Sequence, residues 1–551
     1  MLMWILIGGG KPQWNTMMHN GPYFAELYVK HNIPVIINNE KIILENLAEE
    51  YATLYAKYIK TDYINKNIFN KNFTKDFFKV LPKELIKKYN LKSVTEINFS
   101  LINKKLEKDR EFKLNRSNEV KEKQKKDRLE NEEPYMYCMI DGSKVKVGNY
   151  KIEPPGIFLG RGTHPKLGMI KKRVDPKDVT INLGKDSTVP KPNVNGQWGK
   201  ITHEKDKIWL ASWKDRITGK TKYVFTSVES IFKSKSDMDK FDLARKLKRK
   251  VNSIRDEYIK ELESDDLKLK QMATALYFID KLALRVGGKK DTKGQADTVG
   301  VTSLRVEHIS FIDDVKKIIK LDFLGKDSIR YCHKVDVPNN IYKNLLLFTN
   351  NKDKKNDLFD KIDSKTLNSH LEKFMKGLTA KVWRTYNASF LFQKELDKIK
   401  PDKICGISEN ERLNYLLGLF NMANTKVALL CNHQKNVPSN INATIERIDN
   451  MLKKLKKKKK KTKERKSKIE KEEFNIKINK IDSKIKLLRL KKETKSKMKN
   501  VSLGTSKMNY IDPRIVFAFM KRFQIPEEKL FTKTLLSRFK WASEVDREFR
   551  F

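Results

Sequence analysis

Two short series of apolar residues near the C-terminus restrict most strongly what this chain can fold into. Each series steps alternately by four and three residues, which is the heptad spacing of a coiled-coil seam. A polar run, residues 456–468, separates them. Neither apolar stripe is wide enough for a globular core, so the pattern predicts a protruding antiparallel coiled-coil hairpin. The first series is Ile441, Ile445, Ile448, Leu452 and Leu455, and the second is Phe474, Ile478, Ile481, Ile485 and Leu488.

The predicted hairpin is strongly basic. Residues 451–500 hold 21 Lys and 2 Arg against 5 Glu and 1 Asp, which gives a net charge of +17. One interpretation is a solvated lysine tract, and the other is a basic arm that lies near a nucleic-acid backbone. Both can hold at once, because lysine contacts to phosphate carry no sequence information.

The charge excess extends over the whole chain of 551 residues, which is long enough for about two to four domains. Lys and Arg number 117 against 69 Asp and Glu, and the formal net charge is +48. So large an excess favours a long polyanion such as DNA or RNA as the partner. An anionic membrane surface is the competing partner, but no apolar stretch in the sequence is long enough to span a bilayer.

The cysteines indicate a reducing compartment. Four are present, Cys138, Cys332, Cys405 and Cys431, and they are far apart in the sequence. They form no CxxC pair and no disulfide framework. Cys332 is followed by His333, but no second ligand pair accompanies these two residues, so a zinc site is not expected.

The N-terminal part alternates between strand-like and helical patterns. Apolar runs at residues 33–37 and 42–44 predict strands. The spacing of apolar residues predicts helices over residues 47–59 and 77–89. Residues 103–132 are highly charged with alternating signs, which predicts an exposed helix.

Strand patterns dominate the next part of the chain. Two strand-like runs lie within residues 135–152, and residues 174–230 are expected to be rich in β-structure. A hairpin is predicted there from alternating residues at 208–213 and 222–227. From about residue 237 to residue 285 the pattern is helical again.

Tyr510 lies among small and polar residues, between Gly504 and Pro513. Because Gly and Pro punctuate secondary structure, the sequence predicts a turn at or beside this tyrosine. A phenol at a turn in so basic a chain is a candidate nucleophile for a phosphodiester. The alternative is a structural tyrosine that caps a small core.

Breaking a phosphodiester by attack of an alcohol builds negative charge on the non-bridging oxygens and requires a proton for the leaving alkoxide. The sequence offers no convincing Asp/Glu cluster or His/Cys spacing for Mg²⁺ or Zn²⁺, and no Walker-type loop. Fixed cations are the alternative means of stabilisation. Taken singly each candidate is more often a structural or surface residue, and spacing does not predict that they converge. The candidates are Arg285, Lys326, Arg384 and His433.

The sequence resembles the eukaryotic type IB DNA topoisomerases from about residue 11 to residue 551. The resemblance implies that Tyr510 attacks a DNA phosphate to give a 3′-phosphotyrosine. It also implies that Arg285, Arg384 and His433 stabilise the transition state and that Lys326 protonates the departing 5′ oxygen. Supercoils would then relax by strand rotation and religation, without ATP, metal or cofactor. The stretches that carry the resemblance are residues 153–165, 278–285, 296–309, 322–331, 378–389, 428–434 and 503–514.

The resemblance further implies contacts to double-stranded DNA and, at the cleavage site, to the camptothecin-type poisons of the family. Arg161 also stands out in the sequence itself, because Gly160 and Gly162 let the backbone there approach a ligand closely. An ordinary Gly-rich loop is the alternative. A monomer in the nucleus is expected, with no membrane partner. The expected DNA-binding residues are Arg161, His164, Lys222, Tyr223, Asp327 and Asn509.

The expected fold class is multidomain α+β, closed as a clamp around DNA. Residues 1–10 have no counterpart in the family. The expected parts are a DNA-binding cap with helices and β-structure over residues 11–230, a mainly helical, recombinase-like catalytic lobe over residues 231–436, the coiled-coil linker over residues 437–500, and a small helical C-terminal domain with the tyrosine over residues 501–551. Ten apolar residues should form the core and docking surface of that last domain: Phe517, Phe519, Met520, Phe523, Ile525, Leu530, Phe531, Leu535, Phe539 and Trp541.

The sequence is also compatible with two other classes of protein. Tyrosine recombinases use a similar set of Arg, Lys, His and Tyr residues. Recombinases usually carry His three residues before the second arginine, where this chain has Lys381, and they have no coiled-coil linker. A basic chromatin or RNA-binding protein without enzymatic activity would bind DNA with a steep salt dependence but would form no covalent adduct.

Overall fold

The computed structural model describes residues 12–292, 294–399, 409–435, 437, 440–464 and 471–551. The chain divides into two compact units: residues 1–233 with 290–297, and residues 234–289 with 298–551. Both helices and sheets contribute, so the expected mixed α and β class is confirmed at that level. Three expectations fall on residues outside the described ranges: the unmatched residues 1–10, the hairpin tip at 465–470, and Cys405.

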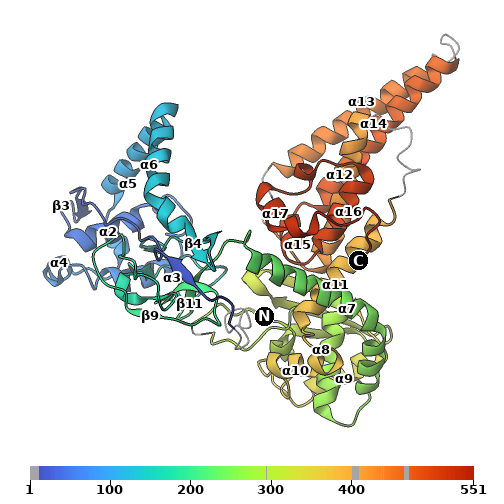
Figure 1. The fold of residues 1–551 in the computed structure, drawn as a ribbon, viewed down its shortest axis with the longest axis horizontal. Coiled ribbons are helices and arrows are strands. Elements are labelled where there is room, and N and C mark those ends of the chain that lie inside the picture. The colour runs from blue at the N-terminus through green and yellow to red at the C-terminus, as the bar shows by residue number, and fades with distance from the viewer. Residues whose placement is uncertain (1–11, 293, 400–408, 436, 438–439, 465–470) are drawn as a thin grey trace. The chain divides into compact units, whose positions relative to one another are not determined.

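The first unit combines short helices with small sheets (Figure 1). Its strands form sheets in the orders β1-β4-β5 and β11-β10-β8-β9, with two-stranded pairs β2-β3 and β6-β7. Only the β8–β9 pair is parallel among the pairs described. The elements are β1 (Met17–His19), β2 (Val35–Ile37), β3 (Glu40–Ile42), α2 (Asn46–Ala56), α3 (Asn67–Phe77), α4 (Lys83–Lys88), α5 (Ser100–Leu114), α6 (Asn118–Met136), β4 (Tyr137–Ile140), β5 (Ser143–Lys146), β6 (Gly156–Ile157), β7 (Ile170–Lys171), β8 (Val179–Asn182), β9 (Lys200–Thr202), β10 (Trp209–Lys214) and β11 (Thr221–Phe225).

Two helix predictions in this unit were wrong in detail. The single helix expected over residues 77–89 is instead the end of α3 and the separate helix α4. Pro82 precedes α4, and its ring restricts the residue before it and removes an N–H, which breaks the helix there. The charged stretch at 103–132 belongs to two helices, because Ser117 caps a new one by accepting a hydrogen bond from the Val120 amide. The expected hairpin at residues 208–227 is confirmed as β10 and β11.

The second unit is mainly helical around one three-stranded antiparallel sheet, β12-β13-β14. The long helix α7 starts at Ile231, earlier than the helical pattern indicated. The elements are α7 (Ile231–Glu261), α8 (Leu267–Leu282), β12 (Ile309–Asp313), β13 (Ile318–Leu324), β14 (Arg330–Asp336), α9 (Asn339–Thr349), α10 (Ser364–Phe374), α11 (Ala380–Leu396), α12 (Glu409–Leu430), α13 (Ile441–Glu464), α14 (Lys471–Lys497), α15 (Leu503–Asn509), α16 (Pro513–Phe523) and α17 (Lys533–Arg538).

The heptad helices are confirmed as α13 and α14. Ile448 and Leu452 of α13 pack against Ile481 and Ile485 of α14, and these four side chains form a hydrophobic cluster of their own. The pair extends as an arm away from the helices of the same unit, as Figure 1 shows. Lys459 of α13 also forms an ion pair with Asp482 of α14.

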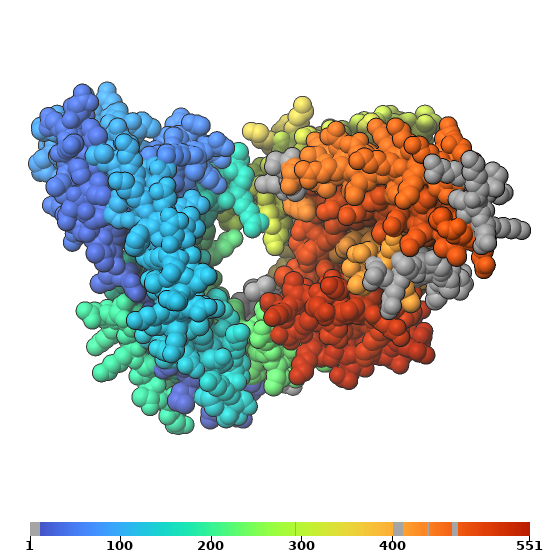
Figure 2. Space-filling model, turned by 90° about the horizontal axis from the view of Figure 1, so that it is seen from above, coloured from blue at the N-terminus to red at the C-terminus, as the bar shows by residue number. Residues whose placement is uncertain are grey.

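The C-terminal residues pack into the core of the second unit. Nine of the ten apolar residues expected to form the docking surface are buried in the main hydrophobic cluster, and Trp541 packs against it half-buried. Two ion pairs add to this packing: Arg538 with Asp237 at 2.8 Å, and Arg514 with Asp242 at 2.9 Å. In the space-filling view the C-terminal residues (red) adjoin the hairpin helices (orange) (Figure 2).

One buried carboxylate joins three helices of this unit. Asp280 of α8 accepts hydrogen bonds from Arg255 of α7 at 2.8 and 2.9 Å and from the indole N–H of Trp383 of α11 at 3.0 Å. The Tyr258 hydroxyl donates a further bond at 2.9 Å. Burial alone would raise the pKa of Asp280, but the hydrogen bonds and charge of Arg255 lower it below its ordinary value.

No helix among the described residues is long and apolar enough to cross a membrane.

Replacing Asp280 by asparagine should destabilise the second unit. The change leaves Arg255 without its buried counter-ion, and breaking such a pair costs about 3 kcal/mol. Denaturant unfolding of the full chain measures the loss, with Asp265→Asn, at an exposed position between α7 and α8, as the matched control. Equal stability of the two variants would contradict the role assigned to Asp280.

Candidate active site

Tyr510 lies in the turn that the sequence predicts. It follows the last residue of α15, and its amide donates to the Ser506 carbonyl at 2.9 Å. Two residues later Asp512 caps α16, which begins at Pro513, by accepting a hydrogen bond from the Arg514 amide. The tyrosine is 6% exposed, so the turn holds its side chain inside the protein rather than on the surface.

A serine of α11 fixes this turn. The Ser389 hydroxyl donates to the Tyr510 carbonyl at 3.0 Å and accepts from the Asp512 amide at 3.0 Å. Ser389 is fully buried, so both bonds form away from water. The backbone that carries the phenol is therefore tied directly to the helix that carries Arg384.

Arg285 reaches the phenol itself. Its Nη1 donates to the Tyr510 hydroxyl oxygen at 2.8 Å. The residue follows the end of α8, where Ala283 adopts a left-handed conformation with φ of 48°. The backbone here passes so close to Gly300 that a Cβ on that residue would lie 2.6 Å from the Arg285 carbonyl. Glycine at position 300 is therefore required for this placement of Arg285.

Arg384 is buried, with an exposed fraction of only 4%. Its two terminal nitrogens donate to the carbonyls of Ala283 and Cys431. Among the described residues, its Nε finds no hydrogen-bond partner although it is buried. The guanidinium carbon lies 5.1 Å from the centroid of the Tyr510 ring. Arg384 therefore has no carboxylate partner among the described residues, and a buried cation in this state is a good receptor for an anion.

His433 also lies against the same tyrosine. Its ring is roughly parallel to that of Tyr510, with centroids 5.4 Å apart and an interplanar angle of 28°. Its Nδ1 is 2.8 Å from the Ser506 hydroxyl, whereas its buried Nε2 has no partner in the described part of the chain. Burial, reinforced by the charges of Arg384, Arg285 and Lys326, lowers the pKa of His433 to about 3. The ring is therefore neutral at physiological pH.

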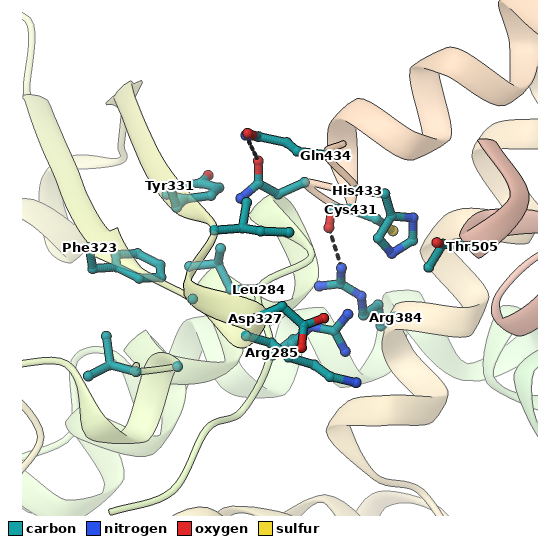
Figure 3. Close-up of a pocket in the computed structure, with 16 residues that line it drawn as sticks. Leu284, Arg285, Phe323, Asp327, Tyr331, Arg384, Cys431, His433, Gln434 and Thr505 are labelled. Atoms are coloured by element: carbon teal, nitrogen blue, oxygen red, sulfur yellow. Dashed lines mark hydrogen bonds between the residues drawn. The ribbon is translucent and has the colours of Figure 1, made fainter. Parts of the chain in front are cut away.

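Lys326 and Asp327 occupy the tight connection between β13 and β14. Both side chains are exposed, and Asp327 has a left-handed backbone with φ of 68°. They line a pocket of about 120 Å³ together with Arg285, Arg384 and His433. Figure 3 shows the labelled side chains of Arg285, Arg384 and Asp327 gathered at this pocket. The structure thus brings four scattered cationic or imidazole side chains to one cavity beside Tyr510.

The remaining expected DNA-binding residues are distributed over both units. In the second unit, Asn509 ends α15 and donates to the Thr505 carbonyl at 3.2 Å. In the first unit, Arg161 and His164 lie in the loop between β6 and β7, and Lys222 and Tyr223 lie on β11.

Lys222 and His164 already have protein partners. The Lys222 ammonium forms ion pairs with Glu153 at 2.8 Å and with Asp215 at 3.2 Å. The ring of His164 packs edge-on against Phe158, and its Nδ1 accepts from the Lys166 amide at 3.1 Å. Burial and the neighbouring Lys166 and Lys220 lower the pKa of His164.

Sequence reasoning missed the polar residues that support the site: Ser389, Ser506 and Asp280. Only Ser506 left a signal, since it stands four residues before Tyr510 and helical spacing places the two on one face. Ser389 and Asp280 act across segments that are far apart in sequence.

The neutral state of His433 predicts a specific pH dependence of stability. Its pKa is lower in the folded chain than in the unfolded chain, so its contribution is full above about pH 6.5 and declines as the pH falls towards 3. Between pH 8 and pH 5 the wild type should therefore lose about 2 kcal/mol more than His433→Gln. Thermal unfolding of both proteins at the two pH values measures this difference. Identical pH dependence would show that the folded ring takes up a proton as readily as the unfolded one.

Comparisons with known proteins cover nearly the whole chain. The protein-family model of the eukaryotic DNA topoisomerase I DNA-binding fragment matches residues 12–226, the model of its catalytic core matches residues 229–466, and that of the C-terminal topoisomerase domain matches residues 482–551. DNA topoisomerase 1 of Caenorhabditis elegans is 40% identical over 548 residues, which are 97% of this chain and 67% of the relative.

Two further relatives show how the lengths differ. DNA topoisomerase 1 of Drosophila melanogaster is 40% identical, and the match covers 98% of this chain but only 55% of the relative. The human mitochondrial DNA topoisomerase I is 38% identical, and the match covers 96% of this chain and 90% of the relative. With identity of this level over almost all of its length, the chain belongs to the eukaryotic DNA topoisomerase I family and is a type IB DNA topoisomerase.

Proposed function

We propose that this chain relaxes supercoiled DNA by cutting one strand transiently, with Tyr510 as the nucleophile. The observation that carries the proposal is the environment of the phenol. Arg285 donates to its oxygen, while two other buried groups beside it, Arg384 Nε and His433 Nε2, have no partner among the described residues. A single phosphate at this position would satisfy both groups and lie next to the nucleophile.

In the first step, the Tyr510 oxygen forms a bond to the phosphorus and the bond between phosphorus and the 5′ oxygen breaks. The phenol gives its proton to solvent water, and Lys326 supplies a proton to the departing 5′ oxygen. Arg285, Arg384 and His433 donate to the non-bridging oxygens as negative charge builds on them. Since Lys326 lies exposed at the tip of its turn, it can reach a strand that enters the pocket from solvent.

In the second step, the free 5′ hydroxyl attacks the 3′-phosphotyrosine and restores the strand. The covalent bond to Tyr510 conserves the energy of the broken phosphodiester, so neither ATP nor another cofactor is required. Between the two steps the cut end rotates and releases supercoils. The substrate is double-stranded DNA, and its charge matches the net charge of +48 on this chain.

The other expected residues would hold the DNA around this centre. We assign Asp327 and Asn509 to the cleavage site itself, and Arg161, His164, Lys222 and Tyr223 to contacts from the cap over residues 11–230. The cap and the catalytic lobe over residues 231–436 would close as a clamp around the duplex.

The remaining segments would complete the enzyme. The basic hairpin over residues 437–500 would link the lobe to the C-terminal domain over residues 501–551. A monomer suffices for this mechanism, because all five reacting side chains lie in one chain. We place it in the nucleus with the relatives named DNA topoisomerase 1, although one relative is named as mitochondrial.

The comparisons favour neither alternative activity. A tyrosine recombinase would act at specific sites as a tetramer. A non-enzymatic DNA-binding protein would show only salt-dependent affinity.

Tyr510→Phe should abolish relaxation while leaving DNA binding intact, because it removes only the nucleophilic oxygen. The wild type should relax negatively supercoiled plasmid in EDTA without ATP, and Tyr510→Phe should show no activity under the same conditions. Tyr415→Phe, on α12 beneath the Lys486 ammonium, serves as the matched control and should relax normally. Relaxation by the Tyr510→Phe protein would remove this tyrosine from the mechanism.

Lys326→Ala should cut slowly because the 5′ oxygen leaves without a proton, with a loss of about 10²–10⁴-fold. A substrate with sulfur in place of that 5′ bridging oxygen needs no such proton, so it should restore the rate of strand cleavage. The matched control is Lys334→Ala, an exposed lysine on β14 of the same sheet. If the sulfur substrate did not restore cleavage by Lys326→Ala, Lys326 would act by another means than proton donation.

A further inference from the structure

The hydroxyl of Ser506 makes one contact within the described residues, and that contact is to a candidate catalytic side chain. Its Oγ lies 2.8 Å from Nδ1 of His433. Ser506 has an exposed fraction of 0% on α15, one helical turn before Tyr510. Neither the chemistry proposed above nor the sequence patterns assign a role to this serine.

The position of the serine proton follows from this burial. A hydroxyl carries one proton, and a buried donor left without an acceptor is costly. In the described part of the chain Nδ1 of His433 is the acceptor within reach of this hydroxyl. The serine must therefore donate to Nδ1, because the reverse bond would leave its own proton without a partner.

The position of the histidine proton follows in turn. A neutral imidazole carries its proton on one nitrogen only, and the other nitrogen accepts. If Nδ1 accepts from Ser506, Nε2 must carry the proton. This nitrogen is the buried atom that has no partner in the described residues, on a side chain that lines the pocket. It then offers a donor to a phosphate oxygen, whereas the other tautomer would oppose that oxygen with a lone pair.

We infer that Ser506 is a positioning residue that selects the Nε2-protonated tautomer of His433 and so turns the imidazole into a hydrogen-bond donor for the scissile phosphate. This inference rests on the proposed function and deepens it.

The same serine also links this selection to the nucleophile. Its carbonyl accepts from the amides of Tyr510 at 2.9 Å and Ile511 at 3.0 Å, so it shapes the turn that carries the phenol. His433 lies between α12 and the coiled-coil hairpin, so the whole hairpin separates it in sequence from Ser506 and Tyr510. The histidine therefore acquires its donor state only when the tyrosine-bearing segment is seated against it.

Kinetics separate this role from simple packing. Ser506→Ala should slow single-turnover cleavage about tenfold, less than the roughly 10²–10³-fold loss on removing a transition-state donor outright. The dissociation constant for DNA should change by less than about twofold, because the contact acts in the transition state. The control is Ser502→Ala in the same segment. The Ser502 hydroxyl contacts the hydroxyl of Thr505 and not the His433 ring, so this variant should keep the wild-type rate.

A second background tests the tautomer directly. In His433→Gln the side-chain amide is a donor whatever its neighbour, so adding Ser506→Ala should change the cleavage rate by less than about twofold. A serine that only supports packing would slow both backgrounds by the same factor, and that result would overturn the inference.

Nitrogen NMR of the wild type with ¹⁵N-labelled histidine gives the independent readout, with His433→Gln used to assign the signals. We expect a protonated Nε2 and an unprotonated Nδ1 in His433, and a mixture of both tautomers in Ser506→Ala. A protonated Nδ1 in the wild type would refute the role of Ser506 and leave the proposed relaxation activity untouched. Failure of the wild type to relax DNA would instead refute the proposed function.

Discussion

The geometry of the site depends on the hydrogen bonds that the Asp280 carboxylate accepts. This carboxylate joins α7, α8 and α11 through Arg255, Tyr258 and Trp383. Arg285 emerges a few residues after the end of α8, and Arg384 is the residue next to Trp383 on α11. Because one buried carboxylate fixes both helices, the two arginines are held in defined positions at the same pocket. If α8 and α11 were joined only by a longer, flexible contact, the two guanidinium groups would not be held precisely enough to bind one phosphate.

Two buried nitrogen atoms at the site have no hydrogen-bond partner within the described chain. This is a physical reason to regard the site as a receptor for an anion. Arg384 is buried with only carbonyl partners for its terminal nitrogens, and its Nε has none among the described residues. The buried Nε2 of His433 likewise has no hydrogen-bond partner among the described residues. Buried donors of this kind cost stability in the free protein. An anion that binds there recovers that cost, so the energy is available for binding the phosphate and its transition state.

Local patterns in the sequence predicted much of the fold, and contacts between distant segments could not be read from them. The heptads predicted α13 and α14, and Gly and Pro predicted the turn at Tyr510. The helix expected over residues 77–89 was wrong because Pro82 breaks it. Arg285 and Arg384 were chosen singly, and their convergence depends on side-chain packing among α8, α11 and the C-terminal segment. Ser389 was missed because its contacts to the turn at Tyr510 join segments that are far apart in sequence.

If Tyr510 is the nucleophile, it becomes joined to the 3′ end of a cut DNA strand. The most direct measurement of this bond uses a substrate whose short 5′ fragment diffuses away after cleavage, so that the covalent adduct accumulates. Protease digestion and mass spectrometry of the adduct then locate the modified residue. We expect a single peptide with a 3′-phosphate ester on Tyr510. An adduct on another residue or at a 5′ end, or no adduct while the DNA is still relaxed, would contradict this role of Tyr510.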